Sequence, residues 1–310
     1  MIMKYIKFII IIAATLVIGS CSSEKLDSNS IFPTESPVRN AFDTWLLNNY
    51  TTPYNIAFNY LYKDNDTDQS YNVIPAEQDK SIALAIMIKH VWLEAYGECC
   101  GENFIKTYSP RVMQLIGSGA YNSNESMVMG TAEGGLKVML YNVNTIDINN
   151  PYIDVDNPYV DKTNPTKDLN YYFFHTMHHE FGHILNQKKN YSTDFNLVSA
   201  AKYKSTDWIN LNDADAPKLG FVSGYASSEA SEDFVEIYSI YITHTETCWQ
   251  KILSDAVNGT DTSGRDAIIA KFNIIKNYFK TSWNIDITQL RDVILKRFGD
   301  IKTLDLKNLK

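Results

Sequence analysis

Four of the six histidines in this 310-residue chain fall within nine residues, from His175 to His183. This segment ends in the sequence HEFGH, which begins at His179. Residues four apart in a helix lie on the same face, so the imidazoles of His179 and His183 can bind one zinc ion. Glu180 projects roughly 60° around the helix from His183, where it reaches a metal-bound water without being a ligand. The chain must therefore form a helix here and bring a third ligand to it, because a catalytic zinc usually has three protein ligands.

The surroundings of the motif favour a helix over 171–186, whose apolar side consists of Phe174, Met177, Phe181 and Leu185. Gly182 lies inside this helix, although glycine there costs about 1 kcal/mol relative to alanine. We interpret it as a position where backbone or substrate must approach closely. We assign structural or surface roles to His175 and His178; the alternative for His175, which lies one turn before His179, is a position flanking the cleft. The alternative for the whole segment is a histidine-rich surface helix.

The third zinc ligand has to come from downstream of the motif. Metzincins use a third histidine preceded by a glycine, but the corresponding positions here are Asn186 and Lys189. A pattern with an aspartate ligand finds only an incomplete match at 259–264. A glutamate ligand on a second helix, packed against the first, remains.

Four acids occupy adjacent positions on one face of such a helix: Glu229, Glu232, Asp233 and Glu236. A solvated acidic face is the ordinary explanation. The apolar residues between the acids, however, indicate a largely buried helix, in which carboxylates need partners. Two registers have the required spacing of four. Glu229 with Asp233 matches the common gluzincin pattern, in which the second acid supports a ligand histidine, and Glu232 with Glu236 offers the same arrangement.

The segments HHEFGH and 225–236 resemble the catalytic domain of the anthrax lethal factor-like metallopeptidases. In that family a tyrosine lies seven residues before the glutamate ligand and another acid lies four residues after it. Tyr225, Glu232 and Glu236 match this spacing. The resemblance implies that Glu232 is the third ligand, that Glu236 orients a ligand histidine, and that Tyr225 donates a hydrogen bond to the oxyanion. Aromatic packing is the alternative role for Tyr225.

The beginning of the chain has the pattern of a secretory signal. A basic start precedes an apolar run over 8–18, which is too short to span a bilayer. The run ends in Ile-Gly-Ser before Cys21, which resembles the lipobox of bacterial lipoproteins and implies diacylglycerol on the Cys21 sulfur. A plain signal peptide is the alternative. We expect a signal over 1–20, a flexible tether over 21–37 and a single metallopeptidase domain over 38–310.

The charge of the chain restricts its partners. Removal of the signal takes away two lysines and no acid, which changes the formal charge from −8 to −10. Nucleic-acid binding normally requires a basic patch, so we expect no nucleic-acid partner.

The whole chain is also similar to a family of bacterial lipoproteins described as substrate import-associated zinc metallohydrolases, with the likeness extending through 115–121 and 130–144. This resemblance implies a zincin fold and association with TonB-dependent uptake. The expected partners are therefore a TonB-dependent transporter and its surface lipoprotein in a Gram-negative bacterium. Ser22, in place of an aspartate, favours the outer membrane.

The remaining pattern predicts an α+β protein. Helices are expected over 38–48 and 77–96, and strands over 54–62, 104–108, 111–116 and 136–143. After a loop over 149–165, further helices are expected over 170–187, 228–243, 246–257, 264–280 and 287–298. We therefore predict a zincin-like, gluzincin-type fold, with a helix/sheet half over 38–168 and a helical half over 169–310.

Two smaller features leave alternatives. The acidic run 64–68 is typical of a solvated turn rather than a calcium loop, because Gln69 stands where an EF-hand needs glycine. Cys248 either forms one disulfide with Cys99 or Cys100, or all three are free thiols.

The predicted function is hydrolysis of peptide bonds by one Zn²⁺ per chain, with a peptide or protein as substrate. Glu180 is the expected general base, and the substrate is expected to pair with an edge strand near 136–143. Two alternatives remain: a zinc-containing substrate-binding lipoprotein of an uptake system, and a zinc amidase or esterase acting on non-peptide substrates.

Overall fold

The computed structural model describes residues 38–63, 70–123, 126–128, 130–133, 135–159 and 167–310. The chain divides into two units at Arg39, and the second unit, 40–310, carries the helices and strands discussed below. The predicted signal, lipid anchor and tether, and the acidic run 64–68, lie outside the described residues. Within the described residues, none of the helices combines the length and apolar character needed to cross a bilayer.

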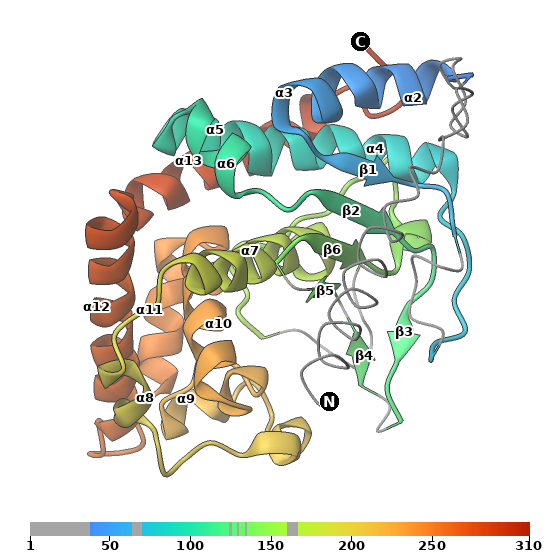
Figure 1. Ribbon diagram of the computed structural model, residues 1–310. Helices are drawn as coiled ribbons and strands as arrows, with labels where there is room; N and C mark the ends of the chain where they lie inside the picture. The colour runs from blue at the N-terminus through green and yellow to red at the C-terminus, as the bar shows by residue number, and fades with distance from the viewer. Residues whose placement is uncertain (1–37, 64–69, 124–125, 129, 134, 160–166) are drawn as a thin grey trace, which may run out of the picture. The chain divides into compact units, whose positions relative to one another are not determined.

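A four-stranded mixed sheet occupies one side of this unit (Figure 1). Its strands, in spatial order, are β1 (Ala57–Asn59), β2 (Val112–Leu115), β6 (Lys137–Leu140) and β5 (Gly130–Glu133). The first three run parallel, and β5 runs antiparallel to β6. A separate antiparallel pair joins β3 (Ala120–Tyr121) and β4 (Met127–Val128).

Two predictions about the strands are wrong. The segment near 136–143 contains β6, which lies between β2 and β5, so β5 rather than β6 forms an edge of the sheet. Residues 104–108 belong to the helix α6 (Glu102–Tyr108). A short apolar run fits a strand or a buried helix equally well. Here the Phe104 ring stacks on Tyr96, with ring centroids 6.1 Å apart. This contact with α5 favours the helix over a strand.

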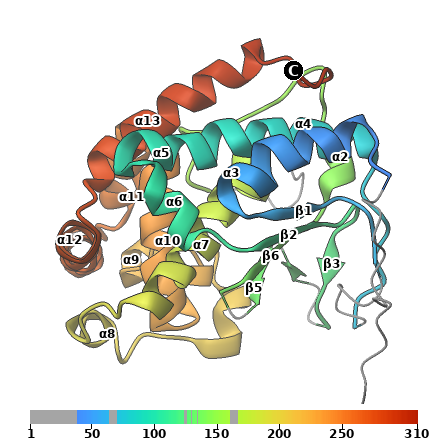
Figure 2. The same cartoon turned by 45° about the horizontal axis from the view of Figure 1, so that its top comes forward.

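The helices confirm most of the remaining predictions. The N-terminal helices are α2 (Ala41–Leu46), η1 (Leu47–Thr51) and α3 (Thr52–Tyr54), followed by α4 (Gln78–Ile88), η3 (Lys89–Leu93) and α5 (Glu94–Cys100). The later helices are η5 (Asn170–Phe174), α7 (His175–Lys188), α8 (Asp194–Val198), η6 (Ser205–Asn210), α9 (Ala216–Leu219), η7 (Tyr225–Ser227), α10 (Ala230–Thr243), α11 (Glu246–Asp255), α12 (Ser263–Trp283) and α13 (Ile287–Asp300). Figures 1 and 2 show α7 between the sheet and the group α8 to α12.

An aromatic cluster fixes α7 against the N-terminal helices. The Phe181 ring meets Tyr96 edge to face at 5.0 Å and Trp92 at 5.2 Å between centroids, and all three side chains are buried. Such edge-to-face pairs add about 0.5–1.5 kcal/mol each beyond the area that they bury. Cys99, Cys100 and Cys248 are free thiols, so the disulfide alternative is not formed.

A buried ion pair connects α10 to α12. Lys271 Nζ lies 2.5 Å from Asp233 Oδ2, and both side chains are fully buried. Tyr203 donates a hydrogen bond to the same carboxylate oxygen (2.9 Å), and Lys271 donates one to the carbonyl oxygen of Gly220 (2.9 Å). Burial raises the pKa of Asp233 to about 6, although the neighbouring lysine acts in the opposite direction. This pair therefore ties α10, α12 and the chain before η7 together.

Replacement of Lys271 by methionine should leave Asp233 buried without its counter-charge. We expect the free energy of unfolding to fall by about 3–5 kcal/mol near neutral pH. The loss should be smaller at about pH 5, because the raised pKa of Asp233 then allows the carboxyl group to bind a proton in the folded state. Urea unfolding at the two pH values measures this.

The double variant K271M/D233L is the control, because an apolar pair of similar volume replaces a buried ion pair at little cost. A loss that does not change with pH and persists in the double variant would contradict the assigned role of the ion pair.

Candidate metal centre

Close contact between α7 and α10 places the motif. A methyl group added to Gly182 would lie 2.8 Å from Val235 Cγ1 and 3.3 Å from Tyr238 Cδ1. Glycine therefore lets the two helices approach until side chains of α10 touch the backbone of α7. The expectation of a close approach at Gly182 is correct, but the neighbours are side chains of α10 rather than backbone or substrate.

Three donor atoms converge across this contact. Glu232 Oε2 lies 3.0 Å from His179 Nε2 and 3.3 Å from His183 Nε2, and the two Nε2 atoms are 3.2 Å apart. Bonds of about 2.0–2.2 Å in a tetrahedral zinc site separate the ligand atoms by about 3.3–3.6 Å. The observed triangle is close to this size, and its atoms are the nitrogen and carboxylate donors that zinc prefers. The residues present therefore fit a zinc ion.

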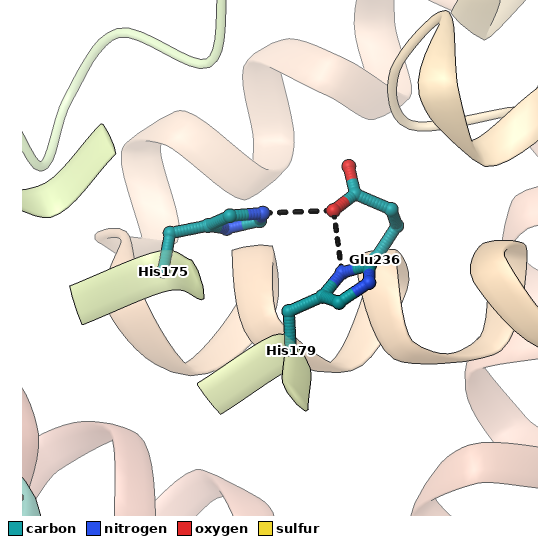
Figure 3. A group of neighbouring side chains, drawn as sticks. All are labelled: His175, His179 and Glu236. Carbon is teal, nitrogen blue, oxygen red and sulfur yellow. Dashed lines mark hydrogen bonds and ion pairs between the residues drawn. The ribbon is translucent and has the colours of Figure 1, made fainter. Parts of the chain in front are cut away.

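Glu236 supports this triangle from α10. Its Oε1 accepts hydrogen bonds from His179 Nδ1 (2.9 Å) and His175 Nε2 (2.8 Å), as Figure 3 shows, and its Oε2 accepts one from Ser223 Oγ (2.6 Å). A proton held on Nδ1 leaves the Nε2 lone pair of His179 free to face the triangle. The carboxylate thus selects the tautomer of His179 that a metal requires.

The charges of the cluster are mutually supportive. Burial alone would raise the pKa of the Glu232 and Glu236 carboxyls, but their histidine partners hold both well below the usual range. Burial likewise opposes protonation of His179, yet hydrogen bonds to Glu232 and Glu236 raise its pKa to about 10. Both acids are therefore ionised near neutral pH, as metal ligation demands, and a metal ion bound here would displace a proton from His179.

Glu180 and Tyr225 flank the cluster. Glu180 is buried on α7, and a methyl group added to Gly130 in β5 would lie 3.9 Å from its Cγ. The Tyr225 ring lies 5.8 Å from the His179 ring and meets Trp208 edge to face at 4.9 Å. Tyr225 is 38% exposed, but desolvation of its phenol, followed by the charges of Glu232 and Glu236, raises its pKa. The phenol therefore keeps the proton that it would donate.

The other candidates lie elsewhere. Glu229 precedes α10 and accepts a hydrogen bond from Ser231 Oγ (2.6 Å), and Asp233 faces Lys271. His178 is fully buried, and its Nδ1 contacts the Tyr96 hydroxyl at 3.0 Å, which agrees with the structural role assigned to it. His175, in contrast, contacts the carboxylate that holds His179. Its spacing of four from His179 was the available signal, whereas no pattern pointed to Ser223.

Two histidines and a glutamate at ligand separations, with a carboxylate behind one histidine, define a zinc-type centre shared by two helices.

Comparison with known proteins agrees with a zinc-type centre. The sequence model of a family described as "Putative zinc-binding metallo-peptidase" matches residues 35–288. A crystal structure described as a "putative zinc-binding metallo-peptidase" from Bacteroides caccae ATCC 43185 is 39% identical, with a TM-score of 0.70, and the match covers 91% of this chain and 100% of that one. The search of curated proteins found no match. The chain belongs to this zinc-binding metallo-peptidase family.

Replacement of Gly182 by alanine should push α7 and α10 apart. Alanine gains about 1 kcal/mol of helix propensity. Overpacking against Val235 and Tyr238 costs about 1–3 kcal/mol, so we expect a net loss of stability together with weaker zinc binding. Thermal unfolding and competition with a chromogenic chelator measure the two effects.

Gly97 provides the matched control, because it also lies in a helix but a methyl group added there meets nothing within 4 Å. Gly97→Ala should preserve zinc affinity and raise stability, and V235A should rescue G182A. Equal effects of the two glycine substitutions would rule out the packing explanation.

Proposed function

We propose that this chain is a zinc-dependent peptidase of the gluzincin type with a zincin-like fold. His179, His183 and Glu232 are the ligands of one zinc ion per chain. The observation that carries this proposal is the triangle of donor atoms next to Glu180. The family membership supports the general activity, and the residue roles rest on geometry.

The chain's own residues supply the remaining steps of hydrolysis. Zinc at this site would act as a Lewis acid and lower the pKa of a bound water towards 7. Glu180 removes a proton from the attacking water and returns it to the leaving amine. Tyr225 donates a hydrogen bond to the carbonyl oxygen of the scissile bond as negative charge develops there, and Glu236 keeps His179 oriented. A single donor of the Tyr225 kind contributes about 3 kcal/mol in other hydrolases.

The substrate is proposed to extend the sheet at β5. This strand is an edge of the four-stranded sheet, and Gly130 brings it close to Thr176 and Glu180 of α7. An extended peptide that pairs with β5 would run alongside the base. Edge pairing thus remains the proposed mode of binding, with β5 in place of the strand near 136–143.

The cellular setting is a further part of the proposal and rests on the sequence pattern around Cys21. A lipid on Cys21 would hold the domain at the outer membrane of a Gram-negative bacterium, where it would act with a TonB-dependent transporter and its surface lipoprotein. The substrate would then be a peptide or protein outside the cytoplasm. Metabolic labelling with a radioactive fatty acid, lost in Cys21→Ser, tests the anchor.

Replacement of Glu180 by glutamine should remove the base and leave the metal. We expect kcat/KM on a quenched-fluorescence peptide library to fall by about 10²–10⁴-fold, with one zinc per chain retained. Wild-type activity in this variant would contradict the assignment of Glu180.

The proposed function first requires that the wild-type protein cleave peptides and that a chelator abolish this cleavage. Ligand binding without cleavage would favour the binding protein instead, and cleavage of ester or amide probes alone would favour the amidase or esterase.

Glu232 and Glu229 form a matched pair for the ligand assignment, because each loses one charge on replacement by glutamine. We expect E232Q to weaken zinc binding more than about 100-fold, beyond the 10–100-fold typical of residues behind the ligands. E229Q should bind zinc as the wild type does. Competition with a chelator of known affinity measures both, and the reverse order would transfer the ligand role to Glu229.

A further inference from the structure

Neither the motif nor the proposed reaction uses His175. It lies on the first turn of α7, four residues before His179, and its side chain is 17% exposed. Its Nε2 approaches Glu236 Oε1 at 2.8 Å, and the Nδ1 of His179 approaches the same oxygen at 2.9 Å (Figure 3). One buried carboxylate oxygen therefore accepts hydrogen bonds from two imidazoles on successive turns of one helix.

These three side chains could also be considered as a second metal site. The geometry argues against this, because the two nitrogens lie only 2.8 and 2.9 Å from one oxygen, whereas ligand atoms around a tetrahedral zinc ion are about 3.3–3.6 Å apart. A metal at this place would also need the Nδ1 of His179, whose proton directs Nε2 towards Glu232 and His183. The arrangement is that of an acceptor with two donors.

We propose that His175 is a positioning residue for the zinc centre. Its Nε2 proton and the hydroxyl of Ser223 fix the two oxygens of Glu236 from opposite ends, so the carboxylate cannot rotate. A fixed Glu236 keeps the Nδ1 proton, and hence the Nε2 lone pair, of His179 in one direction. Zinc affinity is set through this chain of contacts. The inference rests on the proposed ligand set but does not require that the substrate be a peptide.

The test compares donor-free and donor-keeping replacements. We expect H175L and H175A to bind one zinc per chain with about 10–100-fold weaker affinity, and H175Q to recover most of the loss, because its amide can still donate to Glu236. His90→Ala is the matched control. His90 has a side-chain exposure of 20% and lies near the carboxylates of Glu94 and Asp300, outside the zinc triangle. It should leave zinc affinity unchanged.

A double-mutant cycle with E236A separates positioning from general destabilisation. Alanine has no acceptor for the His175 proton, so in the E236A background H175L should add little further loss of zinc affinity. Far-UV circular dichroism verifies folding. Unchanged zinc affinity in folded H175L, or full additivity with E236A, would overturn the proposal. A second zinc ion that H175L removes would overturn it in favour of a metal site.

These measurements use zinc alone. If no substrate is cleaved by the wild type, the proposed peptidase function fails while the affinity data still decide the role of His175. If cleavage is observed and the affinity of H175L is unchanged, the role of His175 fails and the proposed function stands.

Discussion

The approach of α7 to α10 at Gly182 is the constraint on which the rest of the site depends. A helix presents residues 179 and 183 on one face and carries the proposed base, Glu180, beside them, but it does not supply the third ligand. A second helix at short range is needed, and any side chain at position 182 would hold it away. Glycine at position 182 thus lowers the stability of α7, but it allows α10 to come close enough for Glu232 to reach the two histidines.

The carboxylates of the acidic helix α10 point in different directions around the helix axis. Each residue advances about 100°, so Glu232 and Glu236 share the side facing α7, whereas Asp233 faces the interior. Burial raises the free energy of every such charge. Glu232 and Glu236 find imidazoles, and Asp233 finds Lys271 and the Tyr203 hydroxyl. The acids that are clustered in the sequence therefore take part in two separate groups of contacts, one with the histidines of α7 and one with Lys271 of α12.

The sequence allowed the motif helix and its partner helix to be predicted, because periodicity and spacing are local properties. The register Glu232 with Glu236 needed a resemblance, since Glu229 with Asp233 satisfies the same spacing. The helix at 102–108 was missed because aromatic packing decides its conformation. The position of β5 at the edge depends on strand pairing over long distances. Ser223 reaches Glu236 through the fold of a loop, which carries no sequence pattern.

The segment 220–228 connects the Lys271–Asp233 ion pair with the cluster around Glu232 and Glu236. Lys271 holds the carbonyl oxygen of Gly220 at its start, Ser223 donates to Glu236, and Tyr225 lies beside His179. The same lysine also holds Asp233, the residue that follows Glu232 in α10. One buried side chain therefore contacts both the segment that leads to Tyr225 and the helix that carries Glu232. The ion pair of Lys271 with Asp233 thus joins the segment of the proposed oxyanion donor to the helix of the third proposed ligand.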